Sequence, residues 1–169
     1  NKTDIKNVIN TLKSDFLTTG PQVLKFENRL KKIVKSKFAV ASNSATSSLH
    51  TACLALDIKK NDHVWTSSIS FVASANCAIY CGAKVDFVDI DLQTFNICPN
   101  KLEKKLLESK EKKKLPKILV VVHMGGEPCE MKKIYKLSKK YNFKIIEDAS
   151  HALGSKYNGK LVGDCKYSE

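Results

Sequence analysis

Four short segments of the sequence combine residue types that could bind a ligand, and each follows a predicted strand. The first is residues 42–48 (SNSATSS), which lead into a predicted helix. Free backbone N–H groups at a helix N-terminus bind anions, and small side chains allow an anion to approach closely. A phosphate could therefore bind the amides of Ala45 and Thr46. Ordinary helix capping by Ser44 would explain the same segment without any ligand.

The second and third segments could surround a planar ring. Residues 68–71 (SISF) place Phe71 at a strand-to-helix junction, where an aromatic side chain either stacks on a ligand or joins the core. Asp148 ends an apolar strand, and a buried carboxylate needs a partner. That partner could be the nitrogen of a pyridine ring, a salt bridge or a helix cap. Glu147 is expected to point to the other face of the sheet, whereas His151 could reach the same pocket as Asp148.

The fourth segment is residues 122–126 (VHMGG), whose glycines indicate a tight turn with a close backbone approach. His123 could be an acid or base or a buried structural residue, and we assign it no role. Taken together, the phosphate cradle, the aromatic ring and the strand-end aspartate describe a site for a phosphorylated pyridine. The sequence has neither a GK[ST] P-loop nor a GxGxxG fingerprint, which argues against nucleoside triphosphates and NAD.

Strands and helices that alternate along the chain would position these segments. Residues 117–122 (KILVVV) are continuously apolar, as is typical of a strand buried on both faces of a parallel sheet. We expect an α/β fold, with a mostly parallel sheet and helices on both faces, that binds ligands at the carboxyl ends of its strands. The predicted strands are residues 38–41, 63–66, 84–88, 117–122 and 144–147. The predicted helices are one capped by Asp4, one beginning at Pro21, and residues 45–56, 71–80, 102–107 and 131–141, with a hairpin starting in residues 154–157.

The composition is that of an ordinary soluble globular protein of one-domain length, with 169 residues, 43% hydrophobic and 27% charged. No segment is long and apolar enough to cross a bilayer, so we expect a cytoplasmic protein without a membrane partner. The net charge of +12 would suit a nucleic-acid binder, but Arg29 is the only arginine and the lysines are dispersed. No nucleic-acid partner is therefore expected. The six cysteines lack metal-binding spacing, so no metal site is expected, and Cys77 and Cys81 are predicted to be small core residues.

Longer motifs carry a more specific signal. They are SNSATSSLHTACLAL, SISFVASANCAIYCGAKVDFVDID, VVVHMGGEPCEMKKI and EDASHALGSKYNGKLVGD. Through these motifs the sequence resembles the DegT/StrS family of sugar aminotransferases over nearly the whole chain. The resemblance implies a fold-type I transferase that depends on pyridoxal 5'-phosphate (PLP). Residues 1–169 would then be the N-terminal part of the large PLP-binding domain, and the small C-terminal domain would be absent.

The resemblance also implies roles for individual residues. Ala45 and Thr46 would hold the cofactor phosphate, and Phe71 would stack on its ring. Asp148 would pair with the pyridine nitrogen, and His151 would lie near the phenolic oxygen of the ring. The sugar nucleotide would contact Ala45 and the turn that precedes the second helix, formed by Asp15, Phe16, Leu17 and Thr18.

Within the family, NSATSSLH and DASHALGSKY are most similar to the members of pseudaminic acid synthesis. This similarity implies transfer of an amino group from glutamate to C4 of a UDP-linked 4-keto-6-deoxy-N-acetylhexosamine by a homodimer. The resemblance places the Schiff-base lysine beyond Glu169, so the chain would contain no catalytic residue and be inactive alone. Two alternatives stay open: a PLP-dependent sugar 3-dehydratase of the same fold, which has histidine in place of that lysine, and a non-catalytic cofactor-binding or regulatory module.

Overall fold

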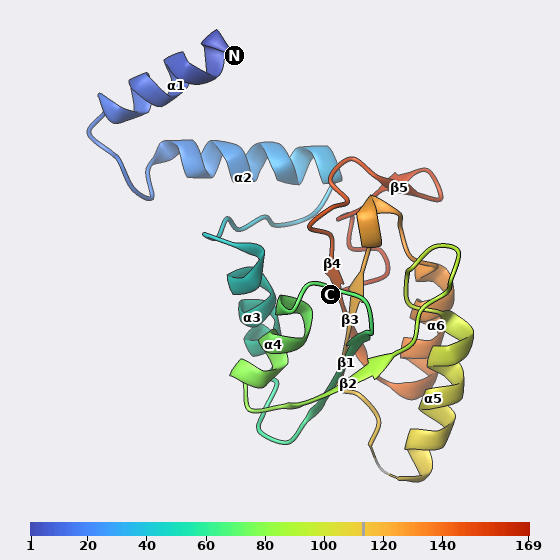
Figure 1. The fold of residues 1–169 in the computed structure, drawn as a ribbon. Coiled ribbons are helices and arrows are strands. Elements are labelled where there is room, and N and C mark those ends of the chain that lie inside the picture. Colours follow the sequence, from blue (N-terminus) through green and yellow to red (C-terminus); the bar gives the residue numbers. More distant parts are fainter. Residues whose placement is uncertain (113) are drawn as a thin grey trace. The chain divides into compact units, whose positions relative to one another are not determined.

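The computed structural model describes residues 1–112 and 114–169, which form two compact units, Asn1–Ala41 and Ser42–Glu169. The first unit contains helices α1 (Lys2–Leu12) and α2 (Pro21–Val34) (Figure 1). Both helices were predicted, but Asp4 is not the cap of the first. Asn1 caps α1, because its side chain accepts hydrogen bonds from the amides of Thr3 and Asp4. Asp4 instead completes a capping box by accepting a hydrogen bond from the amino group of Asn1.

The predicted strand at residues 38–41 is wrong, because the chain has no regular secondary structure there. Phe38 and Val40 are 80% and 85% exposed. A strand exists only when a neighbouring strand satisfies its backbone groups. Here the amide of Ala41 donates to the side chain of Glu27 instead. Four apolar residues were therefore too short a signal to distinguish a strand from an extended connection.

The second unit is built around a four-stranded sheet in the order β2-β1-β3-β4, in which every pair is parallel. The strands are β1 (His63–Ser67), β2 (Lys84–Val88), β3 (Ile118–Val122) and β4 (Lys144–Asp148). The helices are α3 (Ala45–Ala55), α4 (Ala73–Tyr80), α5 (Pro99–Glu111) and α6 (Met131–Tyr141), with a short 3-10 turn, η1 (Met124–Gly126). All the other predicted strands and helices are present, with ends that differ by up to four residues. The largest difference is α5, which begins at Pro99 because proline is accommodated in the first turn of a helix.

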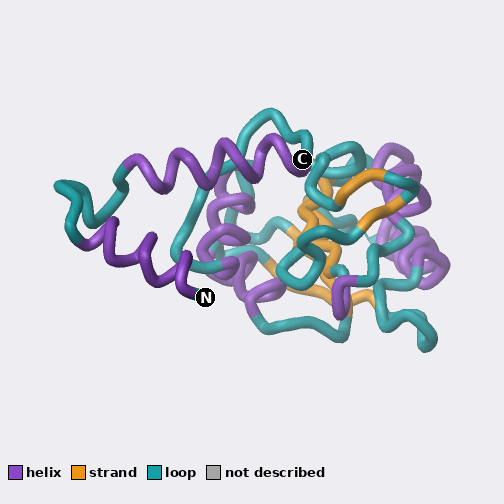
Figure 2. Tube along the Cα trace, turned by 90° about the horizontal axis from the view of Figure 1, so that it is seen from above, coloured by secondary structure: helices purple, strands orange, loops and turns teal. Residues whose placement is uncertain are grey.

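Helices cover both faces of this sheet, which confirms the predicted α/β architecture. Figure 2 shows the strands in orange between helices on either side. One apolar cluster joins the sheet to α5 and α6 through residues such as Leu106, Leu119 and Ile134. The other joins the sheet to α3 and α4 through Cys53 and Val120. All five residues of β3 are buried, as expected for a central strand covered on both faces.

The carboxyl ends of the parallel strands lie at one edge of the sheet, where three loops and the start of α3 are found. Past β4, the predicted hairpin is confirmed as β5 (Lys156–Tyr157) and β6 (Lys160–Leu161), which pair antiparallel. The amide of Glu169 then donates to the carbonyl of Ile145 at 3.0 Å. The final residues of the chain thus lie beside β4.

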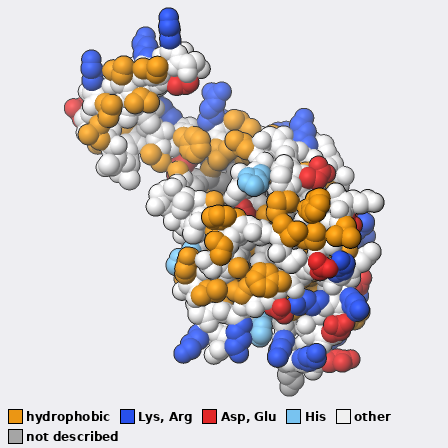
Figure 3. All heavy atoms as spheres, viewed as in Figure 1, with side chains coloured by type: hydrophobic (Ala, Val, Ile, Leu, Met, Phe, Trp, Pro, Cys, Tyr) orange, Lys and Arg blue, Asp and Glu red, His pale blue; other side chains and the backbone are white. Residues whose placement is uncertain are grey.

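On the face seen in Figure 3, hydrophobic side chains gather in patches on the second unit, and several lysines line its lower margin. The exposed apolar side chains of this unit include Phe71, Ile79 and Leu153. Cys77 is buried, as predicted, whereas Cys81 is partly exposed. None of the helices in the described residues combines the length and the apolar character that a membrane span requires. In the same residues, no three histidine, cysteine or acidic side chains gather closely enough to hold a metal ion.

Candidate active site

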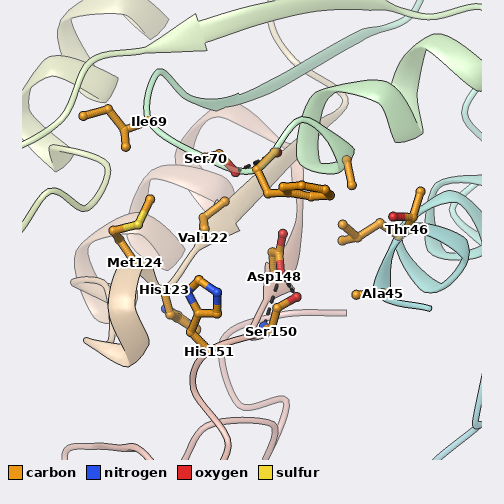
Figure 4. Close-up of a pocket in the computed structure, with 13 residues that line it drawn as sticks. Ala45, Thr46, Ile69, Ser70, Val122, His123, Met124, Asp148, Ser150 and His151 are labelled. Atoms are coloured by element: carbon orange, nitrogen blue, oxygen red, sulfur yellow. Dashed lines mark hydrogen bonds between the residues drawn. The ribbon is translucent and has the colours of Figure 1, made fainter.

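A pocket of about 550 Å³ lies at the carboxyl edge of the sheet, within the second unit (Figure 4). It contains all five residues that the sequence nominated for the cofactor. In Figure 4, Ala45 and Thr46 lie on one side of Asp148, and His123 and His151 on the other. The pocket is lined by Ala45, Thr46, Leu49, Ile69, Ser70, Phe71, Ala73, Val122, His123, Met124, Asp148, Ser150 and His151.

The carboxylate of Asp148 is buried, with 7% of the residue exposed, and both of its oxygens accept hydrogen bonds. Oδ2 accepts from the hydroxyl of Ser74 at 2.7 Å. Oδ1 accepts from the hydroxyl of Ser150 at 2.6 Å and from its backbone N–H at 3.3 Å. Among the described residues, no lysine, arginine or histidine forms a salt bridge with Asp148. A buried negative charge at the pocket surface therefore has hydrogen-bond donors but no positive partner, an arrangement that suits a cationic ligand.

The first turn of α3 supplies hydrogen-bond donors to the opposite side of the pocket. Ser44 caps the helix by accepting a hydrogen bond from the amide of Ser47. Within the described part of the chain, the amides of Ala45 and Thr46 donate to no acceptor. Capping and anion binding, the two interpretations of this segment, are thus compatible, because they use different amides. The free amides and the positive end of the helix dipole favour an anion at this place.

Phe71 lines the pocket but does not join the core, since 71% of the residue is exposed. It lies in the loop between β1 and α4, and its carbonyl accepts a hydrogen bond from the amide of Ser74 at the start of α4. The alternative that this aromatic residue is a core residue is therefore wrong. An exposed ring at the margin of a cavity is free to stack on a planar ligand.

His123 lines the pocket, and both of its ring nitrogens form hydrogen bonds. Its Nδ1 accepts a hydrogen bond from the amide of Cys129 at 3.1 Å, so its proton lies on Nε2, which donates to Glu147 at 2.9 Å. Burial raises the pKa of the Cys129 thiol to about 12, and this neutral thiol donates to the carbonyl of Val122. As predicted, Glu147 does not line the pocket that contains Asp148. Both ring nitrogens are satisfied, which favours the structural interpretation of His123.

Gly126 allows the loop after β3 to pack against the loop after β4. Its φ of +88° lies in the left-handed region, and a Cβ there would come within 2.7 Å of the carbonyl oxygen of His151. Asn96 fixes the same loop by accepting from the amide of Met124 and donating to the carbonyl of Glu127. The backbone of His151 thus packs closely against this loop, and His151 is an exposed residue that lines the pocket.

The four residues predicted to contact the sugar nucleotide lie in the first unit. They form the turn between α1 and α2 and are exposed. The hydroxyl of Ser14 donates to the carbonyl of Phe16 within this turn. These residues are Asp15, Phe16, Leu17 and Thr18.

The sequence did not single out the serines that contact Asp148. Ser74 and Ser150 bind its two oxygens directly, and Ser70 donates to the hydroxyl of Ser74 at 2.7 Å. A signal for Ser74 existed, because it lies three residues after Phe71 in a helix whose residues are mostly apolar. A buried hydroxyl in such a helix requires a partner outside it. Which partner it meets depends on tertiary structure alone.

Comparisons with known proteins show what this chain resembles in sequence and in fold. The model of the DegT/DnrJ/EryC1/StrS aminotransferase family matches residues 1–168. The UDP-4-amino-4,6-dideoxy-N-acetyl-beta-L-altrosamine transaminase of Campylobacter jejuni is 44% identical over 96% of this chain. Two solved structures are similar in fold. One is PseC of Helicobacter pylori, an aminotransferase involved in the biosynthesis of pseudoaminic acid, with a TM-score of 0.84 and 35% identity. The other is the putative sugar aminotransferase Spr1654 of Streptococcus pneumoniae in its PMP-form, with a TM-score of 0.86 and 28% identity.

The chain spans about two fifths of the length of these relatives. It covers 42% of the Campylobacter protein, 42% of the Helicobacter chain and 43% of the Streptococcus chain. The two structural matches extend over 95% and 96% of this chain. The similarity thus extends over both units, and the family model matches a range that includes every residue lining the pocket.

Proposed function

Because the chain belongs to the DegT/DnrJ/EryC1/StrS aminotransferase family, we propose that it forms the cofactor pocket of a PLP-dependent nucleotide-sugar aminotransferase. The observation that carries this proposal is the set of groups around one cavity. Within residues 1–112 and 114–169, they are a buried carboxylate without a cation, two amides without an acceptor at a helix N-terminus, and an exposed aromatic ring. A phosphorylated pyridine offers a cationic N–H, a phosphate and a planar ring that match these three groups.

Asp148 would hold the ring nitrogen of the cofactor in its protonated form. A hydrogen bond between two charged groups is stronger than a neutral one, and burial strengthens it further. When bound, PLP supplies an electron sink for amino-group transfer, and a protonated ring nitrogen makes that sink more effective. Because no described cation forms a salt bridge with it, the carboxylate of Asp148 is available for this contact.

The remaining pocket residues would bind and orient the cofactor. The amides of Ala45 and Thr46 would donate to its phosphate. Phe71 would cover one face of the ring and exclude water from it. His151, at the margin of the pocket, would donate a hydrogen bond to the phenolic oxygen. These contacts would fix the ring while its substituents react.

The lysine that anchors the cofactor is proposed to lie outside residues 1–169. No lysine lines the pocket in the described part of the chain. The three lysines that follow Asp148 are Lys156, Lys160 and Lys166, and the first two lie in the β5–β6 hairpin. Lys160 contacts Asp164 there rather than a pocket residue.

The proposed substrates are a UDP-linked 4-keto-6-deoxy-N-acetylhexosamine, aminated at C4, and glutamate as the amino donor. The names of the Campylobacter and Helicobacter relatives support this sugar class. Residues 15–18 are proposed to contact the sugar nucleotide together with Ala45. The active protein is proposed to be a cytoplasmic homodimer.

The test uses a polypeptide of the relatives' length that includes this chain. It is incubated with PLP, ¹⁵N-labelled glutamate and the UDP-linked keto sugar, and the sugar nucleotide is analysed by mass spectrometry. We expect ¹⁵N in the sugar, with none when the 4-keto group is replaced by a hydroxyl. Loss of the C3 hydroxyl without nitrogen incorporation would instead identify a dehydratase and contradict the proposal.

A further inference from the structure

We propose that Ser74 is a positioning residue, whose hydroxyl fixes the carboxylate of Asp148 in the orientation that receives the ring nitrogen of a phosphorylated pyridine. The inference rests on the proposed function, because it concerns the same pocket. Ser74 lies in the first turn of α4 and is fully buried. It does not line the pocket itself, but its hydroxyl meets the carboxylate of Asp148, which does, at 2.7 Å.

Proton accounting fixes the direction of the hydrogen bonds. A serine hydroxyl has one proton to donate, and an ionised carboxylate can only accept. Ser74 therefore donates to Oδ2 of Asp148, and its own oxygen accepts the hydroxyl proton of Ser70 at 2.7 Å. The chain of donors runs from Ser70 through Ser74 to Asp148. The buried hydroxyl of Ser74 is satisfied as donor and acceptor only when Asp148 occupies this place.

The carboxylate needs such a partner because its terminal torsion is soft. The χ2 angle of aspartate has broad, roughly two-fold preferences, so the side chain alone does not set the carboxylate plane. Ser74 holds Oδ2, and Ser150 holds Oδ1 from the opposite loop. Oδ2 accepts one hydrogen bond and retains acceptor capacity for a further donor, whereas Oδ1 already accepts two from Ser150. Two hydroxyls on different elements thus fix the plane and leave room for the N–H of a ligand.

Ser74 also connects Phe71 and Asp148, the two residues proposed to contact the ring of the ligand. Its amide donates to the carbonyl of Phe71 at 3.1 Å, while its hydroxyl binds Asp148. The same residue therefore ties the loop that carries the aromatic side chain to the acid at the end of β4. Ser150 is exposed and can exchange its contact with water, whereas Ser74 is shielded from water. We therefore assign the larger effect to Ser74.

The experiment measures the binding of two ligands to the 169-residue chain by calorimetry. Pyridoxamine 5'-phosphate has the ring nitrogen and needs no lysine, and benzyl phosphate has a ring and a phosphate but no ring nitrogen. The variants are Ser74→Ala, Ser74→Cys, Asp148→Asn and the double variant Ser74→Ala with Asp148→Asn. The matched control is Ser138→Ala, because Ser138 is another buried helical serine whose hydroxyl donates to a nearby carbonyl, that of Tyr135.

We expect Ser74→Ala to weaken pyridoxamine phosphate binding about tenfold, the lower end of the range for a hydrogen bond to a charged group, because Ser150 still holds Oδ1. Ser74→Cys should lie between wild type and Ser74→Ala, since a thiol is a weak donor. Benzyl phosphate should bind all these variants equally well. Ser74→Ala should add no further loss to Asp148→Asn, because the two residues act as one unit.

Two results would overturn the positioning role while leaving the cofactor pocket in place. One is unchanged affinity of Ser74→Ala and Ser74→Cys for pyridoxamine phosphate, when Asp148→Asn weakens it. The other is an equal loss for both ligands, which would indicate general damage to the pocket. If the wild-type chain bound no pyridoxamine phosphate, the proposed cofactor pocket itself would be contradicted, and this inference with it. The control Ser138→Ala should match wild type for both ligands.

Discussion

Replacement of Asp148 by asparagine should separate the stability of this chain from its ability to bind a pyridine cofactor. Asp148 is buried and has no cation among the described residues. Its stabilisation in the free chain comes from three donors, the hydroxyl of Ser74 and the hydroxyl and amide of Ser150. An asparagine oxygen can still accept from Ser74. The asparagine NH₂ can donate to the oxygen of Ser150, whose own hydroxyl is exposed to water.

The expected cost for the free chain is therefore small. One weak hydrogen bond of 3.3 Å is lost, and a buried charge is removed. Because these effects oppose each other, the free energy of unfolding should change by no more than about 1 kcal/mol. For a chain of this length that is a shift in Tm of at most about 4 °C. The ligand complex is different, because loss of one partner of a buried charged pair costs about 2–5 kcal/mol, or roughly 30- to 5,000-fold in Kd.

Thermal unfolding followed by circular dichroism measures the first quantity, and calorimetric titration with pyridoxamine 5'-phosphate measures the second. Both are made on wild type and on Asp148→Asn. The reasoning is refuted if Tm falls by well over 4 °C while affinity falls in proportion, because Asp148 would then be a structural residue. It is equally refuted if affinity for pyridoxamine phosphate is unchanged.

Three further outcomes follow from the packing and charges of the second unit. Leu119→Ala, at a fully buried position of β3, should destabilise the chain by about 3–5 kcal/mol in urea unfolding; a change below about 1 kcal/mol would contradict the described core. The pKa of Asp62 is lowered from 3.8, mainly because its carboxylate accepts a hydrogen bond from Lys117. The contribution of this pair to the free energy of unfolding is therefore present above pH 4 and is lost as the pH falls through the lowered pKa. Asp62→Asn should thus cost up to about 1 kcal/mol at pH 7 and nothing below that pKa, whereas a pH-independent difference would exclude the ion pair. At pH 8 N-ethylmaleimide should modify Cys165, which is exposed, but not Cys129, which is buried with a pKa of about 12. Mass spectrometry of the native and the unfolded protein measures which cysteines are modified, and modification of Cys129 in the native protein would contradict its burial.

The architecture was predictable from the sequence because it depends on long periodic signals. The run KILVVV predicted a strand buried on both faces, and β3 lies in the interior of the sheet with all its residues buried. The alternation of strands and helices predicted a mostly parallel sheet with helices on both faces. The segment 38–41 failed because four apolar residues contain no information on whether a partner strand is present.

The pocket was predictable in part. Asp148 ends β4, and Phe71 and His151 lie in the loops after β1 and β4, so the rule that ligands bind at the carboxyl ends of parallel strands brings these three together. Ala45 and Thr46 begin α3, and the strand predicted before them is absent, so that rule does not explain their place in the pocket.

The partners of Asp148 were not predictable from the sequence. Ser74 precedes it by 74 positions, and a hydrogen bond across that separation depends on how α4 packs against β4. The same holds for the neutral ring of His123, which is fixed by the amide of Cys129 and by Glu147. A lone histidine in a sequence gives no indication of such partners.

The most direct test of the cofactor pocket is a titration of the ¹⁵N-labelled chain with pyridoxamine 5'-phosphate, followed by amide NMR. The free amides of Ala45 and Thr46 should show the largest shifts, because they would donate to the phosphate. The amide of Ser150, which donates to Oδ1 of Asp148, should shift with the same Kd. The amides of Lys104 and Lys105, beside a lysine-rich groove on α5, should not move. Shifts confined to that groove, or none at Ala45 and Thr46 at saturation, would contradict the account.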